Sequence, residues 1–216
     1  MTEQDESAQK AKLAVDWREF TAVVLLSITA IVTAWSGFQS SKWGGAMSIS
    51  FSQASTARLE AARGESDANR QIAVQVNLYT AWSSAYANDQ TALAEYLASQ
   101  FPEPLASSFK AWRAADPENN PEVPRNPFDM PQYQPEGLKV AAEADARADA
   151  KFQQALDNNQ RGDNYTLLTV IFALVLFFAA VSGRIASPRN QWILLGLAGA
   201  LFVAGLFALL AMPKLV

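Results

Sequence analysis

The sequence predicts an all-α membrane protein with three transmembrane helices and a helical-bundle insert between the first and the second. Two observations predict this fold. Three separate stretches are apolar and free of charged residues over lengths that can cross a bilayer, at 20–41, 164–183 and 190–213. Between the first two stretches lies a polar region of 122 residues, at 42–163, in which apolar side chains recur at helical spacing.

The first predicted span carries no charged residue over 22 positions, and a bilayer core needs about 20 helical residues. Small side chains recur at every fourth position of this span and of the third span. Such stripes let helices approach closely in lipid, so these residues are predicted to pack against the other spans or a neighbouring copy. The stripe residues are Thr29, Thr33, Gly37, Ser41, Gly196, Ala200 and Ala204. The alternative is that the Ser and Thr hydroxyls only bond back to their own helix.

Aromatic and basic residues lie near the ends of the spans, which is typical of side chains that anchor a helix at the membrane–water interface. The predicted anchors are Trp17, Trp35, Lys42, Trp43, Tyr165 and Trp192. An alternative hypothesis makes Gln39, Lys42 and Trp43 a contact for a lipid or a ligand.

The polar region 42–163 holds 11 Lys and Arg against 16 Asp and Glu, a net charge of −5. Its pattern predicts helices at 46–62, with a bend near Gly64, and then at 66–100 and 104–115. Six prolines between 116 and 135 exclude a long helix there, and the interleaved Phe128, Met130 and Tyr133 predict a loop packed against the helices. A partner-binding loop is the alternative. Helix resumes near Glu136 and is predicted to run straight into the second span.

Basic residues favour one orientation in the membrane. Arg184 and Arg189 lie in the short turn between the last two spans, and Lys10, Lys12 and Arg18 precede the first span. Short loops rich in Lys and Arg stay in the cytoplasm, whereas long segments cross regardless of charge. The N-terminal tail, 1–19, is therefore predicted to be cytoplasmic and the insert extracytoplasmic.

The composition excludes several kinds of chemistry. The chain has no Cys and no His, so disulfides, thiolate chemistry, Cys/His metal sites and histidine bases are absent. A net charge of −4 offers no basic surface for nucleic acid. No ionisable residue lies in the middle of a span, which argues against pumps and secondary transporters. We expect no catalytic residue, no cofactor and no metal site.

The remaining hypotheses concern binding. The first is a non-enzymatic envelope scaffold or sensor that lies in the lipid bilayer and binds a protein partner through the insert. The alternative is a homo-oligomeric channel whose pore is lined by Thr29, Thr33 and Ser36.

Three segments also resemble a known group. The sequences TAWSGFQSSKWGG at 33–45, NPFDMPQY at 126–133 and RGDNY at 161–165 resemble segments of uncharacterised bacterial integral membrane proteins. Those proteins have a similar layout of one span, a helical insert and two further spans. The resemblance implies a multi-pass protein of the bacterial inner (plasma) membrane, and it implies no activity.

Overall fold

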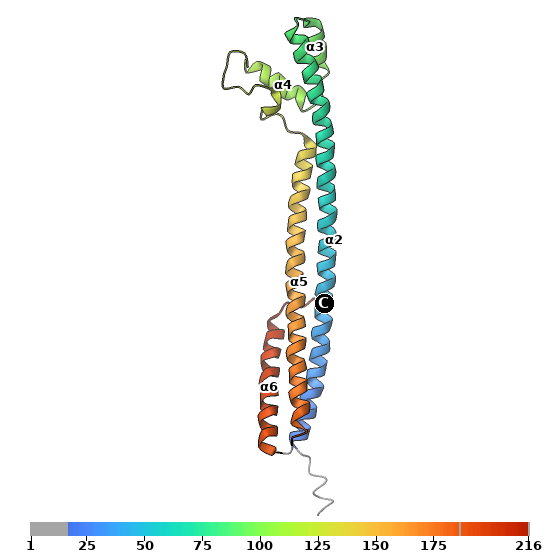
Figure 1. The fold of residues 1–216 in the computed structure, drawn as a ribbon, viewed down its shortest axis with the longest axis vertical. Helices are drawn as coiled ribbons and strands as arrows, with labels where there is room; N and C mark the ends of the chain where they lie inside the picture. Colours follow the sequence, from blue (N-terminus) through green and yellow to red (C-terminus); the bar gives the residue numbers. More distant parts are fainter. Residues whose placement is uncertain (1–16, 186, 216) are drawn as a thin grey trace, which may run out of the picture. The chain divides into compact units, whose positions relative to one another are not determined.

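The computed structural model describes residues 17–185 and 187–215, and within these ranges it contains helices, turns and no strands. The helices are α2 (Trp17–Ala87), α3 (Thr91–Ser99), α4 (Leu105–Ala114), a 3₁₀ turn η1 (Pro127–Asp129), α5 (Glu136–Ser182) and α6 (Pro188–Ala211) (Figure 1). The helices α2, α5 and α6 each contain a stretch that is long and apolar enough to cross a membrane. The predicted all-α class with three long apolar helices is confirmed.

The first long helix differs from the prediction. The sequence predicted separate helices at 46–62 and 66–100, but α2 runs unbroken from Trp17 to Ala87 and then ends. It ends because Asp89 adopts a left-handed backbone with φ of 58°, and the amide of Gln90 donates to the carbonyl of Ala85 instead of continuing the helix. The predicted bend at Gly64 and the predicted helix through 88–90 were therefore wrong.

The chain divides into two compact units, and α2 and α5 each contribute residues to both. Unit 1 comprises the described residues of 1–50 and 153–216, and unit 2 comprises Phe51–Phe152. In unit 1, the buried residues of α5 form the centre of the core, and α6 packs against them. The buried residues of this interface include Tyr165, Leu168, Phe172, Val175, Ala179, Leu195, Ala198 and Leu209. A Cβ at Gly205 of α6 would lie 2.8 Å from the Phe172 ring, so a larger residue there would require the ring to shift.

In unit 2, α2 and α5 run side by side in opposite directions and meet through small residues (Figure 1). The buried residues of this interface are alanines: Ala54, Ala57, Ala61, Ala68, Ala141, Ala144 and Ala148. Together with Gly64 they recur at alternating spacings of three and four, as in a coiled coil, so each helix presents one narrow face to the other. Two ion pairs flank this face, Arg58 with Asp149 at 2.9 Å and Arg147 with Glu60 at 2.8 Å.

The rest of unit 2 lies between α2 and α5 in the sequence and contains α3, α4 and the proline-rich segment. The helix predicted at 104–115 is confirmed as α4, and the restart near Glu136 is confirmed as the first residue of α5. The proline-rich segment forms turns and the short η1, whose first amides are capped by the side chain of Asn126. Phe128, Met130 and Tyr133 pack on the hydrophobic core of this region, as the sequence predicted.

Candidate functional site

Aromatic side chains gather at the C-terminal end of α2 in unit 2, and we call this group the aromatic cluster. It combines rings from α2, α4, the α3–α4 turn and the proline-rich segment. Its members are Tyr79, Trp82, Tyr86, Phe101, Phe109, Trp112, Phe128 and Tyr133. Trp82 is its centre because it stacks on Tyr79 at 5.5 Å and on Tyr86 at 5.2 Å, and Phe109 meets it edge-on at 4.7 Å. Such ring pairs each add stabilisation beyond the area they bury.

Hydrogen bonds hold the proline-rich segment on the aromatic cluster. The indole N–H of Trp112 donates to the carbonyl of Pro124 at 2.8 Å, and the buried Ser108 hydroxyl donates to the carbonyl of Pro127. These bonds join carbonyls of the proline-rich segment to side chains of α4. The segment is thus an ordered part of unit 2.

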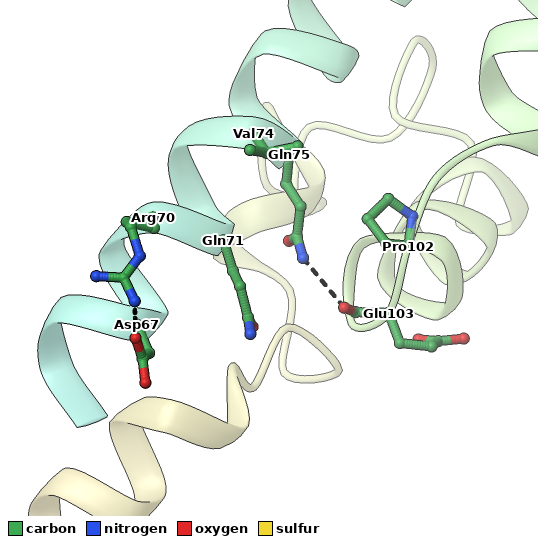
Figure 2. Close-up of a pocket in the computed structure, with 7 residues that line it drawn as sticks. All are labelled: Asp67, Arg70, Gln71, Val74, Gln75, Pro102 and Glu103. Carbon is green, nitrogen blue, oxygen red and sulfur yellow. Dashed lines mark hydrogen bonds and ion pairs between the residues drawn. The ribbon is translucent and has the colours of Figure 1, made fainter. Parts of the chain in front are cut away.

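Gln75 of α2 is the buried polar group that connects three segments of unit 2. Its Nε2 donates to the carbonyl of Glu103 at 3.1 Å, and its Oε1 accepts from the Tyr133 hydroxyl at 2.7 Å. Figure 2 shows the Gln75 side chain reaching from α2 to the backbone of Glu103, whose carboxylate points away from it. Only 2% of Gln75 is exposed, so losing either partner would leave an amide atom unpaired in the core.

A cavity of about 520 Å³ lies beside Gln75 (Figure 2). It is lined by Asp67, Arg70, Gln71, Val74, Gln75, Pro102 and Glu103. Arg70 is paired with Asp67 one turn away, and the Glu103 carboxylate accepts from Ser107. Because its charged groups already have partners, the cavity offers a ligand few unpaired charges.

A second cavity, of about 370 Å³, lies between the end of α2, α3 and α4. Aromatic side chains of the cluster line it, together with the charged residues Asp89, Glu95 and Arg113. The guanidinium of Arg113 lies over the ring of Tyr86 at 5.2 Å and over that of Trp82 at 5.8 Å. We call this space the Arg113 cavity.

Burial changes the ionisation of two tyrosines in the aromatic cluster. It raises the pKa of Tyr79 and of Tyr133 above the usual value, because a phenolate loses hydration when it is enclosed by apolar rings. Both side chains are therefore neutral at physiological pH, and the Tyr133 hydroxyl is available as the donor to Gln75.

The predicted stripe residues do not gather in one place. Thr29 is buried and Thr33 is half-buried, whereas the other five are exposed. A Cβ added at Gly37 or at Gly196 would meet no other atom within 4 Å, so the stripes of the first and third spans do not meet in the single chain. The Thr33 hydroxyl donates to the carbonyl of Thr29 in the same helix, which agrees with the alternative that these hydroxyls bond back to their own helix. Packing of the exposed members against a neighbouring copy stays a prediction.

The predicted anchors fall into two groups. Trp17, Trp35 and Trp192 are exposed and Lys42 is half-buried, so these side chains can reach lipid or headgroups. Trp43 and Tyr165 are instead buried in the core of unit 1, where 5% of Trp43 and 0% of Tyr165 is exposed. Their burial follows from the register of α2 and α5, which places both rings in one hydrophobic core. The Arg161 guanidinium lies 4.7 Å from the Trp43 ring.

Sequence reasoning missed the role of Gln39. This residue is fully buried, and its amide bonds to both backbone groups of Leu215, donating to the carbonyl at 3.2 Å and accepting from the amide at 3.0 Å. The Tyr165 hydroxyl donates to the carbonyl of Pro213 at 3.1 Å. A glutamine in an apolar span was the available signal, but its partner lies 176 residues away in the sequence.

Two buried donors in unit 1, the hydroxyl of Thr29 and the indole of Trp43, have no hydrogen-bond partner among the described residues.

The helices indicate the class of protein to which this chain belongs, but they do not identify a family. Three long apolar helices indicate a multi-pass membrane protein. Within 17–185 and 187–215, no group of three or more acidic residues is placed to hold a metal ion. Comparison with known protein families, with curated proteins and with solved structures finds no match to this chain.

Proposed function

We propose that the protein is a non-enzymatic scaffold or sensor of the bacterial inner membrane, and that its polar region 42–163 is an extracytoplasmic insert that binds another helical chain. The observation that supports this role is a second face on α2. One face of α2 in unit 2 packs on α5, and a different face is uncharged yet exposed.

This second face, which we call the open seam, consists of ten exposed positions at alternating spacings of three and four. They are Ser52, Ser55, Leu59, Ala62, Ser66, Asn69, Ala73, Val76, Thr80 and Ser83. With 3.5 residues per turn, the open seam lies roughly 150° around α2 from the alanines that pack on α5. The six charged residues of α2 in unit 2 all lie between these two faces. A face that only meets water normally carries charges, so a long uncharged face favours a helical partner.

A second copy of the chain fits the open seam. Copies inserted in one membrane with the same orientation place their α2 helices parallel. In a parallel pair, Glu65 and Arg70 occupy flanking positions five residues apart, which is the spacing at which opposite charges pair between helices. Arg58 and Arg63 share that spacing with like charges. Arg58 and Arg70 each have an ion-pair partner in their own chain, Asp149 and Asp67, so a dimer would share or replace these ion pairs. We therefore propose self-association along α2 as the basis of the scaffold.

Cysteine crosslinking tests this proposal, because the chain has no native Cys. The variants Ala62→Cys and Ala73→Cys place a thiol on the open seam, and Ala81→Cys places one at an exposed position outside it. Oxidation in intact membranes should give disulfide-linked dimers with the first two variants and not with the third. Absence of dimers from all three, or equal yields from all three, would contradict self-association along the open seam.

The alternative function, a homo-oligomeric channel, receives less support from the geometry. Thr29 and Ser36 are fully buried inside the single chain, and Ser36 donates to the carbonyl of Val32 one turn earlier. Residues enclosed by their own chain cannot line a pore between copies. Ion flux through liposomes that contain the purified protein would support the channel hypothesis against the scaffold proposal.

A further inference from the structure

The Arg113 cavity combines an apolar floor with unpaired charges of both signs. Its apolar surface comes from Trp82, Tyr86 and Phe109, together with two alanines of α3. Its volume of about 370 Å³ falls in the range of small-molecule sites, which runs from about 300 to 1,000 Å³. The cavity takes no part in the open seam or in the packing of α2 on α5.

Arg113 provides the positive group. It comes from the last turn of α4, and its guanidinium is supported on the faces of Trp82 and Tyr86. It makes no ion pair with any residue that the structure describes. A guanidinium stacked on rings is held in one plane, and its N–H edge can then bind a carboxylate through two parallel hydrogen bonds.

Asp89 and Glu95 provide the negative groups from a different part of the fold. Asp89 lies in the turn after α2, and Glu95 lies on α3. Neither carboxylate has a hydrogen-bond or ion-pair partner among the described residues. The carbonyls of Ser84, Ala85 and Tyr86 in the last turn of α2 are already hydrogen-bonded, so the negative potential at this end of the cavity comes from the two carboxylates. A cationic group is favoured here.

We infer that the Arg113 cavity binds a free α-amino acid with an apolar side chain. Its carboxylate would pair with Arg113, its ammonium group with Asp89 and Glu95, and its side chain would lie on the ring of Phe109. A simple anion fits less well because two carboxylates line the same space, and a simple cation gains no contact with Arg113. This role goes beyond the scaffold function and does not depend on self-association.

Calorimetric titration of the purified full-length protein tests the inference. The probes are L-phenylalanine and L-leucine, with phenethylamine and 3-phenylpropionate as analogues that lack the carboxylate or the ammonium group. We expect saturable binding of at least one amino acid and about tenfold weaker binding of both analogues, because each loses a charge-assisted contact. No binding of either amino acid at millimolar concentrations would overturn the inference, as would equal binding of the analogues.

Two variants and a control assign the binding to the cavity. Arg113→Gln should weaken amino-acid binding by about tenfold, whereas Lys110→Gln, on the same helix but outside the cavity, should leave it unchanged. The double variant Asp89→Asn with Glu95→Gln changes exposed side chains only, so it should fold. It should weaken binding of L-phenylalanine without weakening that of 3-phenylpropionate. Binding that is insensitive to both cavity variants would place the ligand elsewhere.

Discussion

The crossing of Gly64 with Gly137 gives the sharpest test of how unit 2 packs. A Cβ at Gly64 would lie 2.9 Å from the carbonyl oxygen of Gly137 and 3.2 Å from the amide nitrogen of Ala141. Both atoms belong to the backbone of α5, so no side-chain rotation can relieve the contact. We predict that Gly64→Ala destabilises the α2–α5 pair even though alanine favours helix.

The magnitude follows from two opposing terms. Alanine in a helix interior gains about 1 kcal/mol over glycine. Forcing an extra methyl group against a packed backbone costs about 2–3 kcal/mol, at the upper end of the overpacking range. The net change is a loss of about 1–2 kcal/mol, which corresponds to about a tenfold larger population of the opened pair. Gly45→Ala is the matched control, since the added Cβ would meet no atom within 4 Å.

Hydrogen–deuterium exchange, read by mass spectrometry on peptides from 136–152, measures this opening directly. Gly64→Ala should speed exchange of those peptides about tenfold, and Gly45→Ala should not. If the two substitutions leave the peptides equally protected, the close backbone contact between α2 and α5 does not exist and the alanine interface must be rearranged.

Three further predictions concern buried polar groups. Tyr133→Phe leaves Oε1 of Gln75 unpaired, so the free energy of unfolding in urea should fall by about 1–3 kcal/mol. Burial raises the pKa of Tyr79 and Tyr133 in the folded state, so the folded state keeps protons that the unfolded state releases. Stability from these groups should be constant below about pH 10 and fall above it, which alkaline titration of the circular dichroism signal checks. Gln39→Leu removes both hydrogen bonds to Leu215, so faster amide exchange is expected at that residue, and unchanged exchange would contradict the contact.

Local patterns predicted the three apolar helices, α4 and the start of α5. Charge-free length identified the three apolar stretches, and the prolines marked the end of α4 and the start of α5. The prediction failed at residues 88–90 because Asp89 and Asn88 were the only local signals for a stop, and neither residue forbids helix. It also failed at Gly64, where glycine indicated a bend. Close packing against Gly137 explains that glycine instead.

The contacts of the candidate site could not be predicted, because they join residues that are distant in the sequence. Gln75 and Tyr133 are 58 positions apart, and no periodicity relates them. Trp43 and Tyr165 are residue types that often anchor a helix at the membrane–water interface. They are buried because the register of α2 and α5 places them in the core of unit 1, and this register could not be predicted from the sequence. Arg113 and Asp89 lacked any motif, and they line one cavity only because α4 folds back beside the end of α2.

We propose that three spans carry an insert that lies outside the cytoplasm, and single-cysteine labelling tests this orientation most directly. Asn119→Cys places a thiol in the proline-rich segment of unit 2, and Ser187→Cys places one in the turn before α6. Both sites are exposed, and the native chain has no Cys to interfere. In intact cells, an impermeant maleimide should label the first variant and not the second. Labelling of the second alone would place the insert in the cytoplasm and contradict the proposed orientation.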